Sequence, residues 1–157
     1  MQRITPFMWF NNQAEEAREF YVSVFENSRI GATVRHGDAG PGPKATVMTA
    51  AFELDGQELV ALSGGPLFNF SPAISFVVNC DTRAEVDEYW ERLSAGGEPH
   101  VCGWLKDRYG VSWRIVPRAL TRMLTDRDAG RTFRFMQALM NMQKLKMAEL
   151  ERAFDGR

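Results

Sequence analysis

The chain has 157 residues, of which 45% are hydrophobic and 25% are charged, and its formal net charge is −1. These values are typical of a soluble globular protein; they give no basic footprint for nucleic acid, and no apolar run approaches the ~20 residues that a membrane helix needs. Two cysteines are too few for a disulfide framework, and the N-terminus lacks the layout of a signal peptide, so we expect a cytoplasmic protein.

The first half of the chain predicts a strand, a helix and three further strands. Residues 3–10 (RITPFMWF) are an apolar run typical of a buried strand. Asn12 and Glu15 have the spacing of a capping box, which predicts a helix through about Phe25. Asp55-Gly56 favours positive φ and predicts a β-hairpin. The other elements expected here are a strand at 29–36, a glycine- and proline-rich loop at 37–45, and hairpin strands at 45–54 and 57–63.

A second series of elements follows the sequence GGP at 64–66. Residues 73–79 predict a strand, and Thr82 with Glu85 forms another capping box. The helix that it opens is expected to end at Gly96-Gly97. Strands are expected at 98–105 and 111–117, joined through 106–110. The order of strand, helix and hairpin therefore occurs twice.

The tail belongs to neither repeat. Residues 118–124 predict a short helix, and residues 131–154 predict a single longer one. Methionines and phenylalanines lie along one stripe of that longer helix. Such a stripe is typical of core packing or of a contact between subunits.

These elements resemble the vicinal oxygen chelate (VOC) superfamily, which contains the glyoxalase, bleomycin-resistance and dihydroxybiphenyl dioxygenase proteins. More closely, the chain resembles the PhnB-like branch, whose domain also carries the label 3-demethylubiquinone-9 3-methyltransferase. The segments that carry the resemblance are ITPFMWF (4–10), Phe20-Tyr21 with Phe25, LSGGP (62–66), AISF (73–76), Asp87 and Trp90 with Leu93, CGWLKDRYGVSW (102–113) and Val116-Pro117.

The resemblance implies an α+β fold in one VOC domain over residues 1–157. Two βαβββ units, 1–66 and 71–117, would form half-barrels, and residues 118–157 would add a helical tail. The resemblance also implies a homodimer.

Metal-dependent members of the superfamily hold one divalent ion with four inward-facing side chains. Alignment places these at Pro6, Ala61, Ala73 and Arg114. None of the four side chains can coordinate a cation, and Arg114 would repel one. The two histidines of the chain fall outside these positions. We therefore expect no metal ion, and because no strand is followed by a G-x-G-x-x-G turn, we expect no S-adenosylmethionine or other cofactor.

Arg114 is the residue most worth testing for function. Ser112 and Arg114 alternate with Trp113 along the last strand, so they share a face, which we expect to line the half-barrel. An arginine there would pair well with a carboxylate or phosphate ligand. In the alternative, Arg114 pairs with an internal acid or extends to solvent. The other residues expected to line the cavity are Met8, Phe10, Ser63, Ser75 and Val77.

Three functions remain open. We favour metal-free binding of a small, anionic or aromatic molecule in the half-barrel cavity. A second hypothesis is an enzyme, related to the lyases, transferases or dioxygenases of the superfamily, in which Arg114 stabilises charge and Asp107, Cys102 or Tyr109 transfers a proton. A third is a structural dimer module, which would lack a pocket of ~300 Å³ or more. The second hypothesis is weakened because Asp107 is in a context typical of a turn residue and Cys102 in one typical of an inert buried thiol. Trp104 and Trp113 are typical of packing anchors and not of catalytic residues.

Overall fold

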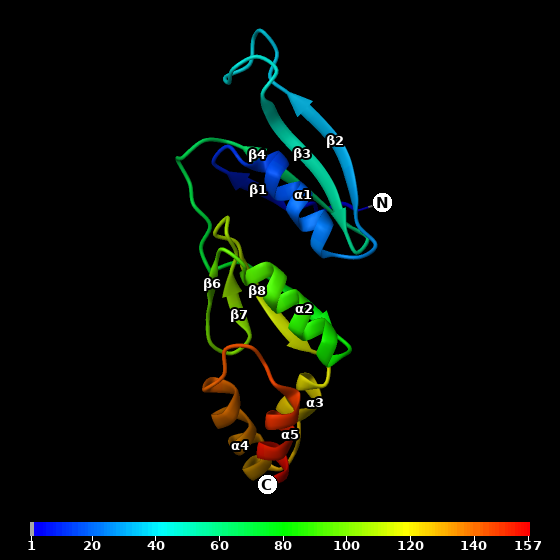
Figure 1. Cartoon of the computed structure of the whole chain (residues 1–157), viewed down its shortest axis with the longest axis vertical. Coiled ribbons are helices and arrows are strands. Elements are labelled where there is room, and N and C mark those ends of the chain that lie inside the picture. Colours follow the sequence, from blue (N-terminus) through cyan, green and yellow to red (C-terminus); the bar gives the residue numbers. More distant parts are fainter. Residues whose placement is uncertain (1) are drawn as a thin grey trace. The chain divides into compact units, whose positions relative to one another are not determined.

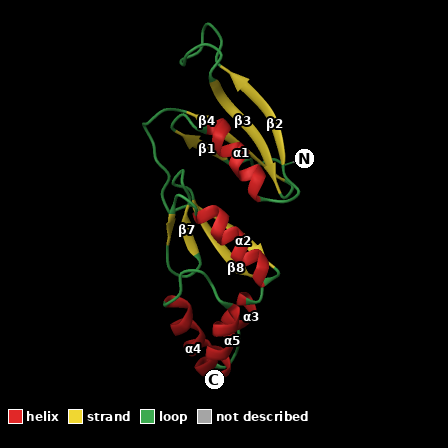
Figure 2. Ribbon diagram, in the orientation of Figure 1, coloured by secondary structure: helices red, strands yellow, loops and turns green. Residues whose placement is uncertain are grey.

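The computed structural model describes residues 2–157, which form eight strands and five helices (Figure 1). Contacts divide the chain into two units, one that ends at Phe70 and one that spans Ser71–Arg157. Each unit has a four-stranded mixed sheet with a helix across it (Figure 2). The predicted α+β fold with two βαβββ repeats is confirmed. Within residues 2–157, no helix has the length and apolar character that crossing a bilayer requires.

The first unit runs in the order strand, helix and three strands. Its elements are β1 (Phe7–Phe10), α1 (Ala14–Val24), β2 (Arg29–Arg35), β3 (Val47–Leu54) and β4 (Gln57–Ser63). The sheet order is β1-β4-β3-β2, with β1 parallel to β4 and the other neighbours antiparallel. The predicted hairpin at Asp55-Gly56 is confirmed, since both residues have positive φ, 47° and 82°, between β3 and β4.

The capping box predicted at Asn12 and Glu15 is wrong. The N-cap residue of α1 is Gln13, and its side chain makes no capping hydrogen bond. The backbone N–H of Ala14 instead donates to Ser63 Oγ at the end of β4, over 3.2 Å. An acceptor from a distant strand therefore replaces the local cap, which sequence spacing alone does not reveal.

The second unit repeats the same order. Its elements are β5 (Ser75–Cys80), α2 (Arg83–Ser94), β6 (Glu98–Pro99), β7 (Trp104–Lys106) and β8 (Ser112–Pro117). The sheet order is β5-β8-β7-β6, with β5 parallel to β8. The capping box at Thr82 and Glu85 is confirmed, because the side chain of each accepts a hydrogen bond from the backbone N–H of the other.

Residues 98–105 do not form the single strand that the sequence predicts. Cys102 and Gly103 have positive φ, 60° and 79°, so the backbone turns between β6 and β7. A Cβ atom at Gly103 would lie 2.9 Å from the carbonyl oxygen of Ile115, so this position requires glycine for space as well as for conformation. As a result, Cys102 does not share a strand face with Trp104.

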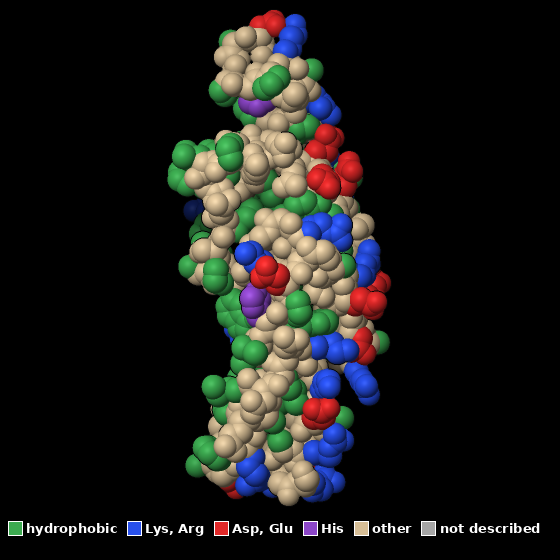
Figure 3. All heavy atoms as spheres, turned by 60° about the vertical axis from the view of Figure 1, so that its left-hand side comes forward, with side chains coloured by type: hydrophobic (Ala, Val, Ile, Leu, Met, Phe, Trp, Pro, Cys, Tyr) green, Lys and Arg blue, Asp and Glu red, His purple; other side chains and the backbone are tan. Residues whose placement is uncertain are grey.

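The tail also differs from its prediction. The short helix α3 (Leu120–Leu124) forms as expected, but the single helix over 131–154 is in fact two, α4 (Ala129–Met140) and α5 (Met147–Asp155). On α4, Phe133 and Met140 are exposed. Hydrophobic side chains reach the surface of the tail beside Lys and Arg (Figure 3).

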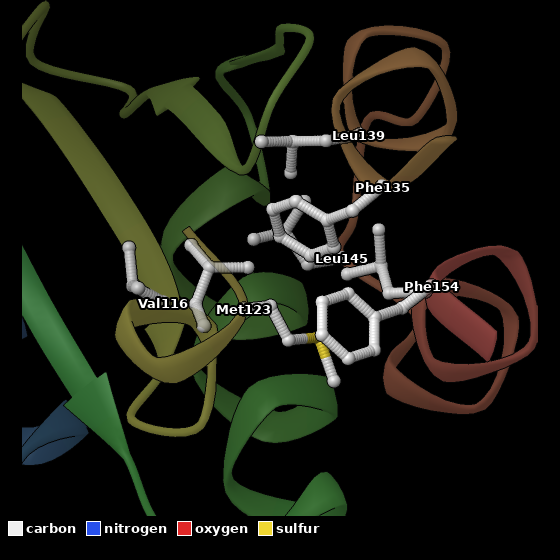
Figure 4. Packing of buried hydrophobic residues seen from close by; sticks show 8 residues of the cluster. Val116, Met123, Phe135, Leu139, Leu145 and Phe154 are labelled. Carbon is white, nitrogen blue, oxygen red and sulfur yellow. The ribbon is translucent and has the colours of Figure 1, made fainter. Parts of the chain in front are cut away.

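The break between α4 and α5 lets both helices pack against one cluster, which we call the tail core. Its buried residues are Val116, Leu120, Met123, Phe135, Leu139, Leu145, Leu150 and Phe154. In Figure 4, Phe135, Leu145 and Phe154 point toward one another. A continuous helix over 131–154 would extend about 36 Å and carry its last turns away from β8. Part of the predicted stripe serves as core, since Met136, Met142 and Met147 pack partly buried against this cluster, whereas Met140 is exposed.

Candidate functional site

The last strand of the second unit, β8, presents two different faces. Trp113 and Ile115 are buried on the side that α2 covers. Ser112 and Arg114 alternate with them and lie on the opposite face. Strand pairing extends that face as two rows, Ser75–Ser112–Lys106 and Val77–Arg114–Trp104. These six residues are called the Arg114 face below, and they include four of the residues that the sequence predicts for the site.

The Arg114 guanidinium packs on an aromatic ring, and no acidic side chain among the described residues pairs with it. Its guanidinium carbon lies 4.9 Å from the centre of the Trp104 ring, which is the geometry of a cation–π contact. Arg114 Nε is buried and donates no hydrogen bond to any residue of the described range. No carboxylate within residues 2–157 forms an ion pair with Arg114, so the internal acid partner considered from sequence is not found. A buried donor without an acceptor lowers the stability of the fold. The guanidinium is therefore suited to donate hydrogen bonds to an anionic ligand.

The surroundings of Arg114 combine hydroxyl groups, a second cation and apolar surface. Ser112 is buried, and Val77 is 46% exposed. Lys106 is exposed at the end of β7. Sequence reasoning missed two members of this face, because it assigned Trp104 to packing and Lys106 to the connection between strands. The pairing of Trp104 with Arg114 and of Lys106 with Ser112 is the signal that would have found them.

Met8 and Phe10 lie in the core of the first unit, where only 5% and 2% of their surfaces are exposed. The Phe10 ring lies 6.4 Å from that of Tyr21 on α1. The expected lining role of Met8 and Phe10 therefore needs correction, because α1 covers the side of the sheet from which they project. Both faces of β1 carry large apolar side chains, so hydrophobicity did not reveal which face is covered.

On β1 and β4, the side chains of the uncovered face are shifted by one position from the residues that the sequence alignment assigned to it. Met8 pairs with Ala61, and both are buried. Trp9 pairs with Leu62 on the alternate face, in the same way that Val77 pairs with Arg114 in the second unit. Val60 and Leu62, and not Ala61, therefore lie on the open face of β4.

The remaining predicted residue, Ser63, borders a groove of about 1040 Å³ in the first unit. Its walls come from the ends of β1, β2 and β4, the start of β3 and the loop between β2 and β3. Trp9 lines the groove and is fixed there, because its indole N–H donates to the Gly65 carbonyl oxygen over 2.9 Å. A Cβ atom at Gly64 would overlap the Trp9 ring, and Gly65 has a positive φ of 93°, so each glycine of LSGGP is required for its own reason.

The residues present do not fit the divalent ion that metal-dependent members of the resembled superfamily hold. Pro6 and Ala73 lie outside β1 and β5, and Ala61 is in the core. The open faces carry Trp9, Leu62, Val77 and Arg114 instead, and none of these side chains is a metal ligand. Among residues 2–157, no three His, Cys, Asp or Glu side chains come together as a metal site would require.

Asp107 is a buried structural carboxylate. Its Oδ1 accepts hydrogen bonds from the backbone N–H groups of Tyr109 (2.8 Å) and Val111 (3.0 Å), and its Oδ2 accepts one from the Trp113 indole (2.8 Å). These bonds order the connection between β7 and β8. Because Trp113 lies on the α2 side, this carboxylate does not face Arg114.

The two cysteines are free thiols. Burial raises the pKa of Cys80 to about 11, with a further contribution from the charges of Glu85 and Asp81. Cys80 is therefore a protonated, inert thiol at neutral pH. Cys102 is partly buried in the turn before β7, where it packs against the tail core.

Comparison with known proteins gives a family match over most of the chain. The family model described as 3-demethylubiquinone-9 3-methyltransferase matches residues 2–116, so it ends before α3. A search of curated proteins found no match to the chain.

Solved structures have the same fold. A PhnB protein from Bacillus cereus is 38% identical, with a TM-score of 0.68, and the match covers 74% of this chain and 99% of that one. Protein PA1353 from Pseudomonas aeruginosa is 24% identical, with a TM-score of 0.62 and coverage of 74% and 98%. The fosfomycin resistance protein FosX of Listeria monocytogenes, in a complex with Mn(II) and sulfate, is 16% identical, with a TM-score of 0.54 and coverage of 73% and 89%.

Proposed function

The chain belongs to the 3-demethylubiquinone-9 3-methyltransferase family, the PhnB-like branch of the VOC superfamily, and from that premise we propose that it binds a small aromatic anion on the Arg114 face without a metal ion. The observation that carries this proposal is the guanidinium of Arg114, which stacks on Trp104 while its buried Nε has no acceptor among the described residues. A carboxylate or phosphonate would supply that acceptor, and a charged, two-pronged hydrogen bond to arginine is among the stronger polar contacts.

The neighbours of Arg114 favour a ligand with one flat apolar part. Trp104 and Val77 flank the cation on either side in the sheet and offer apolar surface to a ring. Ser75, Ser112 and Lys106 form the next row and would add hydrogen bonds to the anionic group. An aryl carboxylate such as 4-fluorobenzoate has both parts and is a suitable probe.

Methyl transfer is not part of this proposal. The motif sought for the methyl donor S-adenosylmethionine is a glycine-rich turn between a strand and a helix, as in dinucleotide-binding proteins. Here β1 leads to α1 through Asn11–Gln13, and β5 leads to α2 through Asp81 and Thr82, so neither connection contains a glycine.

The test is binding of 4-fluorobenzoate measured by ¹⁹F NMR titration. We expect Arg114→Ala to raise the Kd by about tenfold or more, which corresponds to about 1.4 kcal/mol. The Kd of Arg114→Lys should lie between those of the wild type and Arg114→Ala, because an ammonium keeps the charge but not the planar geometry of the guanidinium. Neutral 4-fluorobenzyl alcohol should bind wild type and Arg114→Ala equally weakly.

Arg83→Ala is the matched control, because Arg83 is an exposed arginine on α2 in the same unit. It should bind the probe as wild type does. The proposal is contradicted if Arg114→Ala binds 4-fluorobenzoate as tightly as Arg83→Ala does, or if the wild-type chain shows no binding at millimolar concentrations.

An enzyme that uses Asp107 is the weaker candidate. Both oxygens of this carboxylate already accept hydrogen bonds within the β7–β8 connection, and they lie on the side of the sheet away from Arg114. A binding role needs no proton-transfer group and agrees better with this arrangement. The proposal also includes a homodimer, supported by exposed Leu67 and Ile74 between β4 and β5. It includes a cytoplasmic location as well, supported by two free cysteines.

A further inference from the structure

The helical tail reaches the Arg114 face at one end. Val116 follows Arg114 by two residues on β8 and therefore projects from the same face of the sheet. Val116 is a member of the tail core, in which it packs with side chains of α3, α4 and α5 (Figure 4). The tail thus begins where the Arg114 face ends.

The tail also holds the turn that precedes Trp104. The backbone N–H groups of Cys102 and Gly103 donate to the carbonyl oxygens of Met142 (2.7 Å) and Gln143 (2.9 Å) in the connection between α4 and α5. The carbonyl oxygen of Gly103 accepts from the Ile115 N–H over 2.8 Å, so the same turn is fixed to β8. The next residue along the chain is Trp104, whose ring carries the Arg114 guanidinium.

Two side chains anchor this connection to the rest of the unit. Leu145 is buried in the tail core, and its side chain lies 3.0 Å from the place where a Gly103 Cβ would be. Lys144 Nζ donates to Asp87 Oδ1 on α2 over 2.7 Å, and this contact lowers the pKa of Asp87. The connection therefore has a fixed position between the turn at Cys102 and the helix α2.

We propose that the tail is a positioning part of the ligand site: by holding the Cys102–Gly103 turn it orients Trp104, so that docking of the tail and binding of an anion at Arg114 stabilise each other. This inference rests on the proposed function for the identity of the ligand. The tail lies beyond residue 116, where the family match ends, so this coupling is a property that the family model does not contain. By linkage, any ligand that requires the ordered Trp104 must favour the docked tail to the same degree.

Leu145→Ala tests the positioning role, with Met140→Ala as its control because Met140 is an exposed residue of α4. We expect Leu145→Ala to raise the Kd for 4-fluorobenzoate about tenfold, within the usual range of coupling between sites. The Trp104 indole resonance in the ¹H–¹⁵N spectrum should also shift. Met140→Ala should change neither. Lys144→Ala removes an anchor without opening a cavity and should raise the Kd by a smaller factor. It takes the place of Leu145→Ala in this test if Leu145→Ala does not fold.

Protection of Cys102 from neutral iodoacetamide by bound ligand is a readout that a purely structural role of the tail would not move. Cys102 should react slowly in the wild type and faster in Leu145→Ala. Saturating 4-fluorobenzoate should slow the reaction in the wild type and not in Arg114→Ala. Buried Cys80, whose pKa is about 11, serves as the internal reference that stays unlabelled.

The outcomes separate the two proposals. If Leu145→Ala and Lys144→Ala bind the probe as wild type does while Arg114→Ala does not, the positioning role is refuted and the proposed function stands. If the wild type binds no probe, the proposed function fails. In that case an unchanged Trp104 resonance and unchanged Cys102 labelling in the folded tail variants would refute the positioning role as well.

Discussion

Replacing Asp107 by alanine is expected to lower the free energy of unfolding by about 3–5 kcal/mol. The carboxylate is buried and accepts three hydrogen bonds, two from backbone N–H groups and one from the Trp113 indole. Its removal leaves these donors in a buried place without an acceptor, and each such donor is costly. Urea denaturation followed by tryptophan fluorescence measures the change.

Glu91→Ala is the control for Asp107→Ala, because Glu91 is an exposed carboxylate on α2 of the same unit. It should change the free energy of unfolding by less than about 0.5 kcal/mol. The loss of unfolding free energy in Asp107→Asn should lie between those of Glu91→Ala and Asp107→Ala. An amide keeps one acceptor oxygen but places its N–H donors against the donors that the second carboxylate oxygen served. Equal stability of Asp107→Ala and Glu91→Ala would show that the carboxylate does not hold the hairpin.

Phe135→Ala is expected to lower the free energy of unfolding by about 3–5 kcal/mol, the usual range for the loss of a buried aromatic side chain. Phe135 is 0% exposed at the centre of the tail core, whereas Phe133, two residues earlier on α4, is 63% exposed. Phe133→Ala therefore removes the same atoms from the same helix and should cost less than about 0.5 kcal/mol. The comparison isolates burial from helix propensity, because both variants replace phenylalanine by alanine in α4.

The pair also tests whether the tail folds as part of the second unit. If thermal unfolding shows Phe135→Ala and Phe133→Ala with the same midpoint, the tail core does not contribute to the stability of the chain. A separate early transition in Phe135→Ala would show instead that the tail unfolds on its own.

Local rules explain why much of the fold could be predicted from the sequence. The capping box at Thr82 and Glu85 and the hairpin at Asp55-Gly56 depend on residues that are close in the chain, and both are present in the structure. The repeated order of strand, helix and hairpin follows from such signals. The pairing of Ser112 and Arg114 on one face follows from strand alternation.

The missed features depend on contacts between distant residues. The break between α4 and α5 contains neither glycine nor proline, and it forms because the connection bonds to the turn at Cys102 and Gly103. Ser63 caps α1 from another strand. Met8 and Phe10 were assigned to the wrong face because the side of β1 that α1 covers is decided by packing, and both sides of this strand are apolar.

The stacking of Arg114 on Trp104 likewise could not be read from spacing. The two residues are ten positions apart, and a turn with positive φ interrupts the segment before β7. Only the register of β7 against β8 places the ring beside the guanidinium. The same register brings Lys106 beside Ser112, and so adds a second cation to the face.

Anion binding by a guanidinium in the place of a metal ion is tested most directly by calorimetric titration of 4-fluorobenzoate into the chain before and after treatment with a chelator. The affinity should be the same in both samples, should not rise when Zn²⁺, Ni²⁺ or Mn²⁺ is added, and should be lost in Arg114→Ala. Loss of binding on chelation, with recovery when one of these ions is restored and retained in a one-to-one ratio, would contradict it.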